Sequence, residues 1–130
     1  MNKSNISIKS HDGKIKTETG QLAVDVYSNE KEIVIIAPIA GVSEEDINLT
    51  INEEILVIRG DRQIPILNQN PENKPVTSEC FWGPFSRAIV LPEYTEINKI
   101  EASFKKNILI ITIPKNQQPQ SRTIKIQHQE

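Results

Sequence analysis

The 130-residue sequence is poor in the residues on which most catalytic, metal-binding and disulfide-linked proteins depend. It has one cysteine, so no internal disulfide can form, and a lone thiol suits a reducing compartment. Its two histidines, His11 and His128, lie in opposite tails and neither flanks Cys80. The sequence therefore offers neither a set of metal ligands nor a catalytic Cys–His pair. The five glycines are scattered, which excludes a glycine-rich phosphate loop. We therefore expect no enzyme, no catalytic residue, no metal and no cofactor.

The sequence also lacks the signals of membrane and nucleic-acid proteins. No apolar run is long enough to span a bilayer. The first 20 residues contain four lysines but no apolar signal-peptide segment. The formal net charge of −2 leaves no strongly basic surface for nucleic acid. We expect a cytoplasmic protein that binds neither membranes nor nucleic acid.

What the sequence does contain is a series of short, isoleucine-rich segments. Hydrophobic residues make up 37% of the chain and aromatics only 5%, and the dominant isoleucine favours strands. No segment predicts a helix longer than a turn or two; Ser43 is a candidate N-cap for one acidic turn at residues 44–46. About eight short strands separated by turns predict an all-β, antiparallel, immunoglobulin-like β-sandwich. The segments are residues 22–27, 32–37, 47–52, 55–59, 79–91 and 101–115.

The clearest of these segments is residues 101–115. Ala102 and Phe104 alternate with polar neighbours, whereas residues 108–113 are almost wholly aliphatic. Between them lies Lys106-Asn107, and asparagine enters left-handed backbone at lower cost than most residues. This pattern predicts a tight β-hairpin with one half-exposed and one buried strand.

Three further local predictions concern strand ends and packing. Gly60 is expected to end the strand that starts at Ile55. Residues 80–82 are expected to form a strand in which Cys80 is a packing residue. The Gly83-Pro84 pair is expected to break that strand.

The hairpin also carries a family resemblance. Ala102-x-x-x-Lys106-Asn107-Ile108-Leu109 resembles the A-x-x-x-n-G-v-L signature of the α-crystallin domain, which defines the small heat-shock proteins, here of bacterial type. Asn107 stands where that family has glycine. Four more segments resemble the family in the same order, and the carboxyl-terminal Ile124-x-Ile126 resembles its I-x-I anchor. The segments are AVDVY at 23–27, APIAGVSEEDI at 37–47 (with Ala40 where proline is usual), ILVIRGDR at 55–62 and GPFSRAIVLP at 83–92.

The resemblance implies a division of the chain into three parts. Residues 1–20 would be a short, flexible N-terminal arm, residues 21–115 the α-crystallin-like sandwich, and residues 116–130 a C-terminal extension that carries the anchor. Residues 61–78 would be a dimerisation loop within the sandwich. The arm is shorter than is usual in the family and has no aromatic residue.

The C-terminal anchor and its receptor are predicted together. Ile124 and Ile126 project to one face of an extended tail, with Lys125 on the other. The resemblance implies that they enter an apolar groove between residues 47–51 and 100–104, which would be edge strands of opposite sheets. Plainer interpretations stay open: the tail is merely frayed, and the groove side chains are ordinary core. The inward-facing groove residues are Leu49, Ile51, Ala102 and Phe104.

The loop at residues 61–78 is long and proline-rich, and loops of this length usually have a function. The resemblance implies a short strand at residues 74–78 that pairs with residues 22–27 of a partner subunit. A floppy surface loop is the alternative. The apolar residues of the predicted contact surface are Ile64, Ile66, Leu67 and Val76.

The function implied by the resemblance is that of an ATP-independent holdase chaperone in the stress response. It would bind unfolding client proteins and prevent their aggregation. Homodimers would be the unit, and the tails would join them into higher homo-oligomers. The alternative is a β-sandwich adaptor, similar to co-chaperone domains, that recognises one specific folded partner. An adaptor has no need of the Ile124-x-Ile126 tail, whereas the short arm without aromatics keeps this alternative open.

Overall fold

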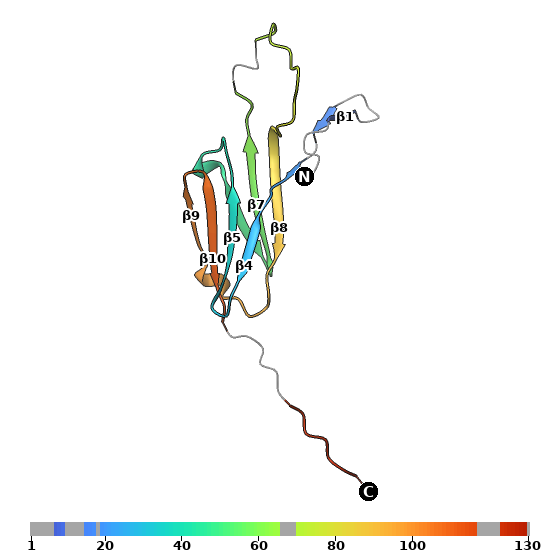
Figure 1. The fold of residues 1–130 in the computed structure, drawn as a ribbon, viewed down its shortest axis with the longest axis vertical. Coiled ribbons are helices and arrows are strands. Elements are labelled where there is room, and N and C mark those ends of the chain that lie inside the picture. The colour runs from blue at the N-terminus through green and yellow to red at the C-terminus, as the bar shows by residue number, and fades with distance from the viewer. Residues whose placement is uncertain (1–6, 10–14, 18, 66–69, 117–122, 130) are drawn as a thin grey trace.

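The computed structural model describes residues 7–9, 15–17, 19–65, 70–116 and 123–129. Within these residues the chain forms a β-sandwich of two four-stranded sheets (Figure 1). A separate two-stranded antiparallel ladder joins β1 (Ser7–Lys9) to β2 (Ile15–Thr17). The predicted sandwich is therefore confirmed.

The first sheet has the order β4-β5-β10-β9, and all its neighbouring strands are antiparallel. The two central strands are the most aliphatic in the chain, because they pack against the core on one face and are flanked by strands on both sides. The outer strands β4 and β9 each pair on one side only. The bounds are β4 (Asp25–Ser28), β5 (Glu32–Pro38), β9 (Glu101–Lys105) and β10 (Ile108–Pro114).

The second sheet has the order β3-β8-β7-β6. Its pairs are antiparallel except that β3 lies parallel to β8. Two short 3₁₀ helices connect strands, η1 (Glu44–Asp46) before β6 and η3 (Ile97–Lys99) before β9. The bounds are β3 (Gly20–Gln21), β6 (Asn48–Asn52), β7 (Ile55–Arg62) and β8 (Gly83–Val90).

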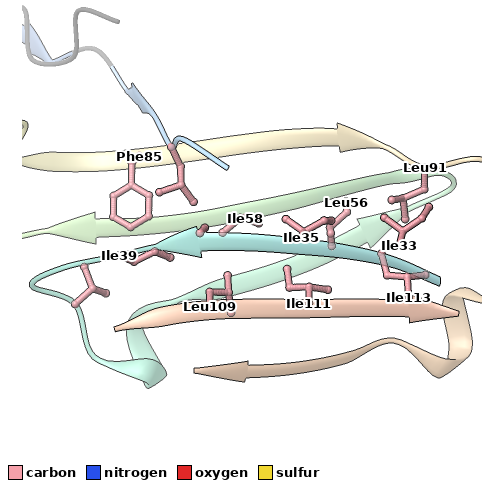
Figure 2. Packing of buried hydrophobic residues seen from close by; sticks show 13 residues of the cluster. Ile33, Ile35, Ile39, Leu56, Ile58, Phe85, Leu91, Leu109, Ile111 and Ile113 are labelled. Carbon is pink, nitrogen blue, oxygen red and sulfur yellow. The ribbon is translucent and has the colours of Figure 1, made fainter. Parts of the chain in front are cut away.

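The core lies between the two sheets, where alternate residues of the central strands point inward (Figure 2). In β10, Leu109, Ile111 and Ile113 are buried while the intervening residues face outward. Burying one such aliphatic side chain contributes roughly 1.5–3 kcal/mol. The alternation in the sequence therefore translates directly into the core. Its buried members are Leu22, Ile33, Ile35, Ala37, Ile39, Val42, Leu56, Ile58, Phe85, Leu91, Leu109, Ile111 and Ile113.

The turn between β9 and β10 has the predicted form. Lys106 and Asn107 have φ angles of 53° and 61°, which is the left-handed pair that a two-residue hairpin loop of type I′ requires. The Asn107 side chain also donates a hydrogen bond of 3.1 Å to the Ile39 carbonyl. The Ile39 amide in turn donates to the Asn107 carbonyl at 2.7 Å. The turn is thereby tied to the residue that follows β5.

We expect Asn107→Val to lower the free energy of unfolding by about 1–2 kcal/mol more than Asn107→Gly does. Both variants lose the side-chain hydrogen bond to Ile39, but only valine places a branched Cβ on left-handed backbone. Urea unfolding of the two variants measures the difference. Equal urea midpoints and equal slopes for the two variants would show that left-handed backbone at residue 107 does not cause the expected difference in stability.

Three predicted strand boundaries are wrong. Residues 22–27 do not form one strand, because β3 ends at Gln21 in the second sheet and β4 starts at Asp25 in the first. Leu22 is buried at this crossing, whereas Val26 is 49% exposed. Gly60 does not end β7, which continues to Arg62. A Cβ at Gly60 would lie 2.3 Å from the ring of its cross-strand partner Phe85, so glycine is needed there for packing.

The third wrong boundary is the break predicted at Gly83-Pro84, because these two residues instead begin β8. Proline lacks the amide hydrogen that a central strand needs. Here β3 pairs only with Phe85 and Ser86, so Pro84 lies where one side of β8 is free. Conversely, the strand predicted at residues 80–82 is absent, because the chain joins the sheet only at Gly83.

Two side-chain predictions also need correction. Ser43 precedes the predicted acidic turn, but its side chain makes no capping hydrogen bond. Cys80 is exposed and is not a packing residue, because residues 80–82 lie outside the sheet that would have buried it.

Candidate functional site

A cavity with an apolar floor opens between β6 and β9, the outer strands of the two different sheets. Its volume is about 190 Å³. The core-facing side chains of these outer strands are only partly covered. The residues that line the cavity are Glu44, Ile47, Leu49, Ala102, Ser103, Phe104 and Leu109.

The floor of this cavity is continuous with the core. Leu49 and Phe104 are half-buried and pack against the core cluster, and Leu109 is 3% exposed. Glu44 and Ser103 are exposed and supply polar groups to the lining. The apolar side chains of the floor suit aliphatic groups, while Glu44 and Ser103 add polar groups to the same lining.

The structure brings together three of the four predicted groove residues. Leu49, Ala102 and Phe104 line the cavity, whereas Ile51 packs against the core without lining it. Leu109 was not among the predicted residues. It lies opposite Phe104 in the β9–β10 register. The predicted two-residue turn fixes this register, so it could have been used to assign Leu109 to the lining.

Ile47 and Ser103 also line the cavity without having been named, although both lie within the two predicted edge segments. Glu44 lies outside those segments, and η1 places it in the lining. No pattern in the sequence signals this position, because it depends on how the β5–β6 connection crosses between the sheets.

The backbone edges beside the cavity are also open. Both β6 and β9 pair on one side only, so each leaves a row of backbone groups without a strand partner. Such edges readily accept another extended chain. The cavity and the two edges together could therefore take both the side chains and the backbone of an extended peptide.

The predicted anchor residues are strongly exposed on the single chain. Ile124 is 78% exposed and Ile126 is 92% exposed. Residues 123–129 form no regular element. The chain leaves β10 at the end of the sandwich opposite the β7–β8 loop (Figure 1).

Residues 63–82 connect β7 to β8, and the described parts of this connection, residues 63–65 and 70–82, extend beyond both sheets (Figure 1). Ile64 is 39% exposed and Val76 is 99% exposed. Ile66 and Leu67, the other predicted contact residues, lie outside the described residues. Residues 74–78 form no strand in the single chain.

The described part of the chain contains no group of three His, Cys, Asp or Glu side chains placed to hold a metal ion. His11, one of the two histidines, lies outside the described residues. Among the residues with described positions, no helix has the length and apolar character needed to cross a membrane.

Comparison with known proteins gives consistent matches. A sequence profile of the Hsp20/alpha crystallin family matches residues 25–127. Small heat shock protein C4 of Rickettsia felis is 35% identical over 105 residues, which are 78% of this chain and 61% of that protein. The chain thus spans less than two thirds of the length of that relative. A probable 15 kDa heat shock protein of Leptospira interrogans is 30% identical over 128 residues, 97% of this chain and 94% of that protein.

Solved structures agree with the sequence matches. Heat shock protein 16.0 from Schizosaccharomyces pombe has a TM-score of 0.70 at 27% identity, covering 84% of this chain and 77% of that one. A small heat-shock protein from Xylella fastidiosa has a TM-score of 0.66 at 27% identity, covering 82% and 96%. The profile match, the relatives and the shared sandwich show that the chain belongs to the Hsp20/alpha crystallin family of small heat shock proteins.

Proposed function

We propose that this protein is a cytoplasmic, ATP-independent holdase that binds unfolding proteins and keeps them from aggregating. The observation that carries the proposal is the cavity with an apolar floor between the open edges of β6 and β9. An unfolding protein exposes aliphatic side chains and unpaired backbone, and the cavity with its edges can take both. Binding of this kind needs no chemistry, so no nucleotide is required.

The same cavity is the proposed receptor for the tail of a neighbouring subunit. Ile124 and Ile126 would enter it together, with Leu49, Ala102 and Phe104 as the contact surface and Ile51 supporting it from the core. Two buried isoleucines contribute roughly 3–6 kcal/mol before the cost of ordering the tail. Each contact is therefore modest and reversible, and a client can compete with the tail for the cavity.

The proposed dimer uses the edge of the first sheet opposite β9, together with the β7–β8 loop. β4 is an edge strand whose outer side is free, and the β7–β8 loop protrudes with Val76 almost fully exposed. In the dimer, residues 74–78 of one subunit would pair with β4 of the other. A segment whose hydrogen-bonding partner is on another chain has no reason to form a strand alone. The absence of a strand at residues 74–78 is compatible with this arrangement.

The holdase proposal predicts that the protein suppresses the heat-induced aggregation of a labile enzyme without ATP, as measured by light scattering at several subunit ratios. Ala102→Lys should remove most of the suppression, because it places a charge at an exposed position of the cavity lining. Thr50→Lys is the matched control, since Thr50 is exposed on the opposite face of β6 and should leave suppression unchanged.

A failure of the unmodified protein to suppress aggregation at equimolar subunits would contradict the holdase proposal. If that failure came with tight binding to one native protein, the adaptor function would be supported in its place. Equal losses in the two lysine variants would show that the cavity is not the binding surface.

A further inference from the structure

Arg62 ties three separate segments of the chain together at the base of the β7–β8 loop. It is the last residue of β7. Its Nε donates a hydrogen bond of 2.7 Å to the carbonyl of Ala40, in the connection between β5 and η1. Its Nη1 donates one of 3.4 Å to the carbonyl of Phe81, where the loop returns toward β8.

The same side chain also lies beside an aromatic ring and a glycine turn. The guanidinium carbon lies 5.2 Å from the centre of the Phe85 ring, a distance at which a cation and an aromatic face attract. Gly41 has a φ of +74°, and a Cβ built there would lie 3.5 Å from Cγ of Arg62. The side chain thus lies beside the turn at Gly41 and over the Phe85 ring, with its Nε and Nη1 both hydrogen-bonded.

The two hydrogen bonds hold different structures in place. The bond to Ala40 links β7 of the second sheet to the connection that leaves the first sheet. The bond to Phe81 links the outgoing leg of the loop to its returning leg. A guanidinium can reach two carbonyls at once because its donors form a rigid fork, whereas a lysine ammonium is a single point.

We propose that Arg62 is a positioning residue that sets the direction in which the 63–82 loop leaves the sandwich, and so stabilises the dimer contact made by that loop. The inference rests on the proposed role of the loop in dimerisation. Without the Arg62 fork the two legs could separate, and the loop would sample many directions before meeting a partner. Ordering it would then reduce the affinity of the dimer.

The single cysteine provides a probe at the right place. Cys80 is exposed, adjoins Phe81, and is the only thiol in the sequence. A nitroxide attached to Cys80 reports local motion through its spectral line shape. In a dimer, dipolar coupling reports the distance between the two labels. Analytical ultracentrifugation gives the dimer dissociation constant, and circular dichroism verifies that each variant is folded at the working temperature.

Arg62→Met keeps the side-chain stem and removes both hydrogen bonds. We expect a more mobile label, a broader distance distribution and a dimer dissociation constant raised about tenfold or more, the change expected for one lost charge-assisted hydrogen bond. Arg62→Lys, which keeps one charged donor, should give label mobility and a dissociation constant between those of the unmodified protein and Arg62→Met. Arg59→Met is the matched control, an exposed arginine on the same strand, and should change neither the spectrum nor the dissociation constant.

The proposal is overturned if Arg62→Met and Arg59→Met give the same line shape and the same dissociation constant. It is also overturned if Arg62→Met lowers only the thermal midpoint and leaves the label unchanged. An unmodified protein that is monomeric by analytical ultracentrifugation would refute loop-mediated dimerisation itself. In that case the dimer part of this inference fails with it, while the line shapes still decide whether Arg62 orders the loop.

Discussion

Replacing Ile124 and Ile126 together by serine should reduce the higher assemblies of this protein to dimers while the sandwich stays folded. The two side chains are 78% and 92% exposed on the single chain, so their removal costs no core contact. Each subunit contributes one tail, and the loss is therefore repeated at every tail contact of the assembly. Light scattering coupled to size-exclusion chromatography measures the change as a drop in mass.

The matched control for this prediction is Lys125→Ser. Lys125 lies between the two isoleucines and would project from the opposite face of an extended tail, so its replacement should leave the mass unchanged. An unmodified protein that is already dimeric, or a double variant with unaltered mass, would contradict the anchor. A double variant of unaltered mass whose cavity takes up more apolar dye would show instead that the tail folds back on its own subunit.

Ile111→Ala should strongly destabilise the sandwich, lowering the free energy of unfolding by about 2–5 kcal/mol. Ile111 is fully buried at 0% exposure and lies in register with Ile35 on β5 and Ala102 on β9. Removing its outer carbons leaves a cavity in the middle of the first sheet, which the rigid strands cannot close. A domain of this size has only about 5–15 kcal/mol of net stability.

The neighbouring residue provides the control. Ile110 is 38% exposed and faces away from the core, so Ile110→Ala should cost under about 1 kcal/mol. Urea unfolding gives the free energy of unfolding of each variant, and the two values can be compared if the dependence on urea concentration is the same. Similar losses at both positions would mean that β10 is not held in the register described, because a shift of one residue exchanges its two faces.

Local chemistry in the sequence was enough to predict the sandwich, the β9–β10 hairpin and the inward faces of the strands that line the cavity, whereas the groove between two edge strands was implied by the family resemblance. A two-residue turn with asparagine and a period-two alternation depend only on neighbouring residues, and they also determine which side of a strand is buried. Ala102 and Phe104 could be assigned to the inner face in this way. Leu49 could be assigned by the same reasoning on β6.

Only the tertiary structure decided which sheet each segment joins. Leu22 and Val26 share one alternating pattern, yet the chain passes from the second sheet to the first between them. Alternation could not predict this crossing, because it does not encode which distant strand a segment pairs with. Cys80 alternates like a strand residue but is exposed, since no neighbouring strand extends to residues 80–82. The contacts of Arg62 with Ala40 and Phe81 likewise join residues 22 and 19 positions away in the sequence. Such contacts exist only after both sheets have packed, so no local pattern could have predicted them.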